Sequence, residues 1–238
     1  KNSSFLLALF TALLGMNRLD ALILVLPALL IHVAQNHRRK DFGALALGLL
    51  PLLAWETFAL IYYGFPLPNT AYAKLGTGIP TSVLVQQGLY YFEDSLARDP
   101  ITLSTVIAGL LTIAWKPELR RSALGLGIVF YLFYIVWVGG DFMSGRLLSA
   151  PLLGAVLLVA KVPAAPLAAG AVAWAAMLLI GLSGTSSPLS SGPQYGVGSR
   201  EKAARPHGIA DERAFYYPDT GLLPRLQQRG HVDLQEFA

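Results

Sequence analysis

Seven apolar runs, separated by short polar stretches, constrain the fold of this 238-residue chain more than any other feature. Two of them, 43–63 and 165–183, approach the roughly 20 residues that a helix needs to cross about 30 Å of hydrocarbon. The others must extend into their flanks or be shielded by neighbouring helices. Asp, Glu, Lys and Arg make up 13% of the chain, against roughly a quarter in soluble domains. We therefore predict an all-α, polytopic membrane protein with about seven transmembrane helices. The runs are 4–16, 20–35, 43–63, 101–115, 122–138, 147–160 and 165–183.

The basic residues predict the orientation of these helices, because Lys and Arg are enriched in cytoplasmic loops. The loops 36–42, 116–121 and 161–164 hold seven Lys or Arg in 17 residues, whereas the opposite short loops hold four in 48. This asymmetry places the first three loops in the cytoplasm and the segment from 184 onward outside. The basic clusters that contribute to the net charge of +4 are therefore explained as signals of membrane orientation. For this reason no nucleic-acid partner is expected.

Two segments outside the membrane are expected on the outer side. We divide the chain into a membrane region, 1–183, which includes the outer loop 64–100, and a tail, 184–238. A stripe of apolar side chains in the loop predicts an amphipathic helix lying in the membrane interface. The tail opens with a linker rich in Ser, Gly and Pro and is too short for a sizeable core of its own. We expect it to pack on the outer face of the bundle. The stripe consists of Val85, Leu89, Phe92 and Leu96.

The usual sites of soluble enzymes are missing from the sequence. There is no cysteine, which excludes disulfides, a cysteine nucleophile and cysteine-ligated metals. No glycine-rich dinucleotide or nucleotide motif and no zinc-protease or serine-hydrolase motif is present. The four histidines are scattered over both predicted sides, so a metal site is not indicated, and no cofactor is expected. These histidines are His32, His37, His207 and His231.

Polar side chains gather instead at the outer ends of the apolar helices, in the motifs MNRLDA, YYGFPLPNTAYAK and GGDFMSGR. Each motif joins an ionisable group to a short break that is marked by Gly or Pro and lies beside an apolar helix. For any single residue, snorkelling and ion pairing explain the charge at least as well as function does. Three such motifs on one face favour a binding site, because charges at that depth must pair or meet a charged ligand. The residues concerned are Arg18, Asp20, Asn69, Lys74, Asp141 and Arg146.

This arrangement suits the recognition of a lipid-linked phosphate. Arg or Lys at the headgroup level can bind a phosphodiester while the lipid tail stays between helices, and nearby carboxylates or amides can bind sugar hydroxyls. Glu56, inside the longest run, is either a functional carboxylate or a structural one that is protonated or paired between helices. Aromatic residues near the outer boundaries, such as Tyr90 and Tyr91, are interpreted as an aromatic belt.

The motifs MNRLDALILVLPALL, YYGFPLPNTAYAK, GGDFMSGR and HGIADERAFYYPDTGLL, in this order and spacing, resemble the GT-C glycosyltransferases related to the terminal arabinofuranosyltransferase of mycobacterial cell walls. The resemblance extends from about residue 10 into the tail. It implies a multi-pass protein of the bacterial inner membrane that uses a polyprenyl-phosphate sugar as donor, acts at the periplasmic face and transfers the sugar to a periplasmic glycan or protein. The expected partners are thus membrane lipid, this donor and this acceptor.

The resemblance also implies roles for particular residues. Arg18, Lys74 and Arg146 are expected to bind the donor phosphate. Asp20, Asn69 and Asp141 are expected to bind sugar hydroxyls or to hold those cations in place. The catalytic base of such enzymes is an acidic residue after the first membrane helix, and we expect it upstream of Lys1, in a longer enzyme of which this chain is a C-terminal part. The tail residues Asp211, Glu212 and Arg213 are expected to dock the tail.

One alternative of another class stays open from the sequence. A non-catalytic polyprenyl-phosphate-sugar binding protein or flippase would use the same basic groove. Such a carrier is expected to place polar groups through the middle of the membrane, whereas here Glu56 is the one deep acid and the other charges cluster at one edge. This distribution favours an enzyme that works at one face.

Overall fold

The computed structural model describes residues 3–36, 38–76, 78–115, 117–162, 167–184, 191–196 and 206–229. Within them the protein is all-α, as predicted, with short 3₁₀ turns and a single isolated β-bridge in place of any strand. Much of the predicted tail lies outside the described residues. The helices are α1 (Ser3–Asn17), α2 (Leu22–Gln35), α3 (Arg39–Tyr63), α4 (Asn69–Tyr72), α5 (Thr81–Arg98), α6 (Pro100–Trp115), α7 (Leu119–Trp137), α8 (Ser149–Ala160), α9 (Leu167–Leu182), α11 (Glu212–Thr220) and α12 (Leu222–Arg229).

Each of the seven apolar runs forms a helix. Among the described residues, α3 and α7 are long and apolar enough to cross a membrane by themselves. Helices α5 and α6 pass the same test as a pair, but they are bent by 107° at Asp99. The helices α1, α2, α8 and α9 are apolar and shorter. The structure thus gives two or three candidate spans, and the number seven stays a prediction.

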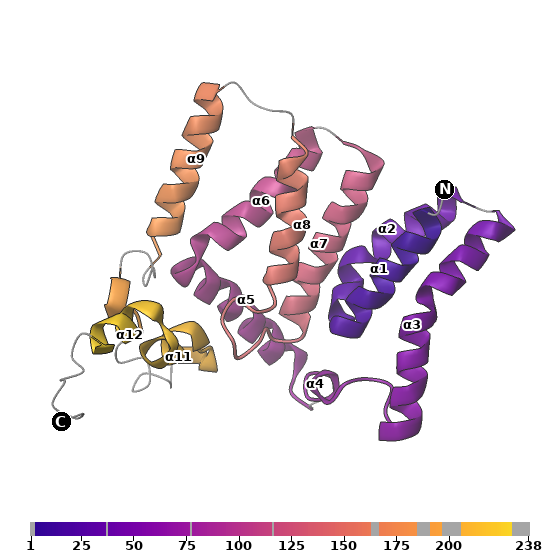
Figure 1. Ribbon diagram of the computed structural model, residues 1–238, viewed down its shortest axis with the longest axis horizontal. Coiled ribbons are helices and arrows are strands. Elements are labelled where there is room, and N and C mark those ends of the chain that lie inside the picture. Colours follow the sequence, from indigo (N-terminus) through magenta and orange to yellow (C-terminus); the bar gives the residue numbers. More distant parts are fainter. Residues whose placement is uncertain are drawn as a thin grey trace.

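The connections between helices lie at two opposite ends of the bundle (Figure 1). The helix ends that flank the α2–α3, α6–α7 and α8–α9 loops are at the upper end of the view, and these are the loops predicted to be cytoplasmic. The α1–α2 corner, α4, the loop between α7 and α8, and helices α11 and α12 are at the lower end. Lys116 and residues 163–166, which belong to the loops predicted to be cytoplasmic, lie outside the described residues. The three polar motifs therefore share one end of the molecule.

Small residues let the helix backbones approach one another closely, which is the usual way that membrane helices pack. A Cβ atom added at Gly48 of α3 would lie 2.6 Å from the carbonyl oxygen of Phe5 in α1. Gly109 of α6 lies against Ala155 of α8 in the same way, at 2.8 Å from its Cβ. At Gly127 of α7 an added Cβ would overlap the Leu24 carbonyl oxygen of α2. These glycines fix how the helices that carry the polar motifs are placed.

The predicted amphipathic helix in the outer loop is confirmed as α5, but its buried face is different from the apolar stripe. The face that packs on the bundle consists of Gly88, Tyr91, Ser95 and Arg98. Leu89 and Leu96 of the stripe are exposed. Gly88 makes this possible, because an added Cβ there would lie 2.6 Å from the backbone of Val136 in α7. Half of the apolar stripe, Leu89 and Leu96, therefore faces the surroundings, whereas Phe92 packs against the core and Val85 is partly buried. The place of α5 in a membrane interface stays a prediction.

Candidate functional site

The first part of the site lies at the corner between α1 and α2. Arg18 follows the last residue of α1 in an extended conformation, and a 3₁₀ turn, Leu19–Ala21, leads into α2. This turn brings the carboxylate of Asp20 back to the guanidinium of Arg18. The guanidinium donates to both carboxylate oxygens, from Nε at 3.1 Å and from Nη2 at 2.6 Å. Such a two-point ion pair has a well-defined orientation.

The second part lies in the loop between α7 and α8. Asp141 follows two glycines in this loop, and 4% of its side chain is exposed. The Nζ atom of Lys74, just after α4, lies 3.4 Å from its Oδ2, and Nη1 of Arg146 lies 3.5 Å from the same oxygen. Lys74 also donates to the carbonyl oxygen of Gly140 at 3.1 Å. One buried carboxylate therefore holds two cations from separate segments.

The two parts meet. Nη1 of Arg18 donates to the backbone carbonyl oxygen of Arg146 at 3.4 Å. We call Arg18, Asp20, Lys74, Asp141 and Arg146 the charge cluster. Its three cations exceed its two carboxylates by one positive charge, and about half of the Arg146 side chain is exposed. The cluster can therefore accept a singly charged anion.

Five of the seven residues predicted for the site are thus brought together, and two are not. Asn69 is the first residue of the short helix α4 and is exposed. Among the described residues, neither the Asn69 amide nor the Glu56 carboxylate has a hydrogen-bond or ion-pair partner. Glu56 lies on α3 and is partly buried. The structure assigns neither of them to the charge cluster.

Sequence reasoning missed Tyr131, which lies in the middle of the apolar helix α7 and is fully buried. Its hydroxyl donates to Oδ2 of Asp20 at 2.5 Å and accepts from Nη2 of Arg18 at 3.0 Å. A buried tyrosine hydroxyl usually has such a partner. A tyrosine inside an apolar run indicates a buried hydroxyl that needs a hydrogen-bond partner, but the sequence does not show which residue that partner is. Tyr131 fixes the α1–α2 corner against α7.

Tyr91 of α5 fixes the loop that carries Asp141 and Arg146. The interpretation of Tyr91 as part of an aromatic belt was wrong, because 1% of the residue is exposed. Its hydroxyl donates to the carbonyl oxygen of Met143 and accepts from the amide of Leu147, each at 3.0 Å. Gly140, at φ +71°, leaves room for this side chain, since an added Cβ would lie 2.7 Å from the Cβ of Tyr91 and 2.8 Å from Cγ of its ring. Both ends of the Met143–Arg146 turn are thereby anchored.

The tail docks on the same loop, as the HGIADER motif was expected to do. The amide of Ala210 donates to the carbonyl oxygen of Phe142 at 2.7 Å. In return, the amide of Ser144 donates to the carbonyl oxygen of Ala210 at 2.9 Å. Asp211 is buried next to this pairing and accepts from the hydroxyl of Tyr195 at 2.8 Å. Nη1 of the buried Arg98 lies 4.0 Å from the same carboxylate. Asp211 thus links Tyr195 to the start of α11 within the tail and faces Arg98 of the bundle.

The surroundings of Asp211 shift two pKa values. Burial raises the pKa of the Asp211 carboxyl, but the hydrogen bonds from Tyr195 and the Ala214 amide, together with Arg213 and Arg98, outweigh it and leave the pKa below its usual value. For Tyr195, burial first and the hydrogen bond to Asp211 second raise the pKa to about 12. The charged carboxylate and the neutral phenol are the forms that the folded tail favours.

The folded arrangement of the tail around Asp211 is therefore expected to weaken in acid. Because the folded state lowers the pKa of Asp211, its contribution is complete above the unfolded value of about 3.9 and is lost as the pH falls below it. Amide hydrogen exchange of α11, corrected for intrinsic rates, is expected to be slow at pH 7 and faster at pH 3. Asp211→Asn is expected to remove this difference. Equal protection of α11 at both pH values in the unaltered protein would contradict the assignment.

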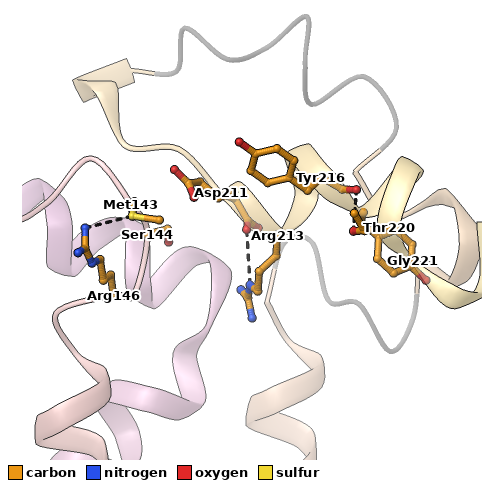
Figure 2. A pocket seen from close by; sticks show the side chains of 10 residues that line it. Met143, Ser144, Arg146, Asp211, Arg213, Tyr216, Thr220 and Gly221 are labelled. Atoms are coloured by element: carbon orange, nitrogen blue, oxygen red, sulfur yellow. Dashed lines mark hydrogen bonds and ion pairs between the residues drawn. The ribbon is translucent and has the colours of Figure 1, made fainter. Parts of the chain in front are cut away.

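A pocket of about 560 Å³ opens between this loop and α11. Figure 2 shows Met143, Ser144 and Arg146 on the loop side, with Arg213, Tyr216 and Thr220 on the α11 side and Asp211 between them. Of the charge cluster, Arg146 alone lines the pocket. The other lining residues are Glu212, Tyr217 and Gly221.

Metal ligands are not gathered at this site. Within the part of the chain that the structure describes, no three His, Asp or Glu side chains are grouped so that they would hold a metal ion. His32 and His207 lie at opposite ends of the bundle, in α2 and beside α5. His37 and His231 lie outside the described residues.

Sequence comparisons relate the chain to known proteins. It is 30% identical, over 254 aligned positions, to the terminal beta-(1->2)-arabinofuranosyltransferase of Mycobacterium tuberculosis, and the alignment covers 92% of this chain. It is 29% identical over 143 positions to the protein of the same name from Corynebacterium glutamicum, which covers 52% of this chain. The chain spans 38% of the length of the first relative and 20% of the second. No family model and no solved structure matches it.

The part of the resemblance that concerns the terminal arabinofuranosyltransferases is thereby confirmed at the level of sequence. The alignment with the mycobacterial protein covers 92% of the chain. The chain is a relative of a segment of the terminal beta-(1->2)-arabinofuranosyltransferases.

Proposed function

We propose that this chain is part of an integral-membrane glycosyltransferase of the GT-C class. The sugar it moves is arabinofuranose, the donor is a polyprenyl phosphate, and the acceptor is a glycan or protein in the periplasm. The names of the two relatives support the transfer of arabinofuranose. The apolar helices support a place in the membrane. We place it in the bacterial inner membrane with the charge cluster at the periplasmic face, opposite the basic loops.

The observation that carries the proposal is the charge cluster itself. A polyprenyl-phosphate sugar is a phosphodiester with one negative charge, which matches the single excess positive charge of the cluster. Arg18, Lys74 and Arg146 keep 27%, 26% and 49% of their side chains exposed, so N–H groups remain for a ligand. Asp20 and Asp141 are each paired with these cations. They are therefore proposed to orient the cations and not to bind the sugar.

The geometry suggests what the cluster contributes to the reaction. An acceptor hydroxyl oxygen attacks the anomeric carbon, and the bond from that carbon to the phosphate oxygen breaks. The leaving phosphate gains a negative charge, and fixed cations next to it lower the energy of the transition state. Asn69, exposed near Lys74, stays a candidate for a sugar hydroxyl, and Glu56 has no part in this proposal. No residue of this chain is assigned as the base that takes up the acceptor proton, and no step requires a metal.

The proposal is tested with Arg146→Ala in the full-length protein. The substitution removes a guanidinium group that is proposed to donate charged hydrogen bonds to the donor phosphate. It is expected to lower kcat/KM for the donor by about 10- to 100-fold. The assay measures transfer of radiolabelled arabinofuranose from a synthetic isoprenyl-phosphate donor. Arg120→Ala, an exposed arginine at the opposite end of α7, is the matched control and is expected to leave transfer unchanged. Normal transfer by Arg146→Ala at normal expression would contradict the proposal.

A further inference from the structure

The pocket between the loop and α11 has a chemistry different from that of the charge cluster. Two carboxylates, Asp211 and Glu212, and two guanidinium groups, Arg146 and Arg213, line it, so its formal charge is zero. An anion such as the donor phosphate is favoured by the charge cluster and not by this pocket. A neutral polar molecule suits the pocket, because its carboxylates, guanidinium groups and hydroxyls offer both hydrogen-bond donors and acceptors.

The size and lining of the pocket fit a short piece of carbohydrate. Its volume of about 560 Å³ is within the range of ligand sites, roughly 300–1,000 Å³. Tyr216, half exposed, and Tyr217 bring aromatic rings whose faces can lie against the C–H groups of a sugar ring. Thr220 adds a hydroxyl, whose proton is already donated to the Tyr216 carbonyl oxygen, so its lone pairs stay available.

Glu212 is the group in the pocket with unused bonding capacity. Asp211 is held by Tyr195 and Arg213 and serves the docking of the tail. In contrast, the carboxylate of Glu212 has no hydrogen-bond or ion-pair partner among the described residues. It is partly buried at the start of α11. A carboxylate in this state accepts hydrogen bonds from ligand hydroxyls at no loss of an existing bond.

Arg146 connects the pocket with the charge cluster. The same side chain lines the pocket and lies 3.5 Å from Asp141. A molecule in the pocket is therefore next to a group that holds the donor phosphate under the proposed function. We infer that this pocket binds the uncharged, hydroxyl-rich end of a glycan acceptor, with Glu212 accepting from its hydroxyls and Tyr216 packing on its ring. This inference rests on the proposed function for the identity of the second substrate.

The test uses the full-length protein, the isoprenyl-phosphate arabinofuranose donor and a synthetic arabinofuranoside trisaccharide as acceptor. Glu212→Gln and, separately, Tyr216→Ala are expected to raise the acceptor KM by about tenfold, the equivalent of one charged hydrogen bond. The donor KM is expected to change by less than about twofold, because the phosphate ligands are untouched. Glu93→Gln, an exposed glutamate of α5 outside the pocket, is the matched control.

The outcomes separate this inference from the proposed function. Transfer by the unaltered protein with an unchanged acceptor KM in both variants would overturn the pocket assignment alone. Absence of transfer by the unaltered protein would count against the proposed function, and the pocket is then tested by saturation-transfer NMR with the trisaccharide alone. Binding that is weakened by Glu212→Gln and Tyr216→Ala would support the pocket, and binding that both variants leave unchanged, or no binding, would overturn it. Since Tyr216 is half exposed, its replacement does not endanger folding.

Discussion

Asp141→Ala is expected to lower donor-dependent transfer by about 10²-fold, because a misplaced binding group near the reacting centre has an effect of that size. The Asp141 carboxylate holds Lys74 and Arg146 and also accepts from the amide of Phe142 at 2.8 Å. Without it, both cations are expected to turn toward water, and the loop loses the hydrogen bond from the Phe142 amide. The measurement is kcat/KM for the isoprenyl-phosphate donor in the full-length protein.

Asp141→Asn is the informative companion of this variant. It keeps the side-chain volume and an oxygen that accepts from Phe142, but it removes the charge that pairs with the cations. An intermediate loss of transfer with normal thermal stability is expected, since the two cations are partly exposed and can be hydrated. Full transfer by Asp141→Ala would show that the cluster has no part in donor use. A loss of folded protein with both variants would assign Asp141 a structural role instead.

The second large effect is expected from Gly127→Ala. The added Cβ would overlap the backbone carbonyl oxygen of Leu24, and a backbone atom cannot turn aside as a side chain does. Helices α2 and α7 must separate, which is expected to cost more than about 3 kcal/mol. Tyr131 lies one turn further along α7, so its bonds to Asp20 and Arg18 would break as well. Thermal unfolding in detergent and the transfer assay measure the two losses.

Gly125→Ala, on the same helix, is the control for this variant. An added Cβ at Gly125 meets the tip of the Ile113 side chain, which is able to rotate. The replacement of glycine by alanine in a helix also gains about 1 kcal/mol of propensity. Stability is therefore expected to stay within about 1 kcal/mol of the original. Equal unfolding temperatures for the Gly127→Ala protein and the unaltered protein would show that α2 and α7 do not pack as described.

The sequence was sufficient for the helices and for the end of the bundle at which the site lies. Apolar length located the seven apolar helices, the amphipathic stripe located α5, and the uneven distribution of Lys and Arg grouped the three polar motifs on one side. The buried face of α5 was not predictable in this way. In a chain surrounded by lipid the apolar stripe need not face the protein, and small residues such as Gly88 decide which face packs.

The partners within the site were also beyond the sequence. Lys74 and Asp141 are 67 positions apart, and their contact depends on the backbone of two loops. Asn69 was predicted with Lys74 because they share a motif, but the short helix α4 leaves the amide exposed while the longer lysine side chain reaches the loop. Tyr131 lies in an apolar run and Tyr91 lies near a predicted membrane boundary. In neither place does the sequence indicate the hydrogen-bond partner of the tyrosine hydroxyl. Only the fold shows that they support the two halves of the charge cluster.

Photo-crosslinking of the donor headgroup tests most directly the claim that the charge cluster forms a single phosphate site. The probe is an isoprenyl phosphodiester with a photoreactive group on the sugar, and labelled peptides of the full-length protein are identified by mass spectrometry. The account predicts labels next to Arg18, Lys74 and Arg146, all suppressed by excess unlabelled donor. Labels confined to the basic loops at the other end of the bundle, or to the middle of α3 around Glu56, would contradict it.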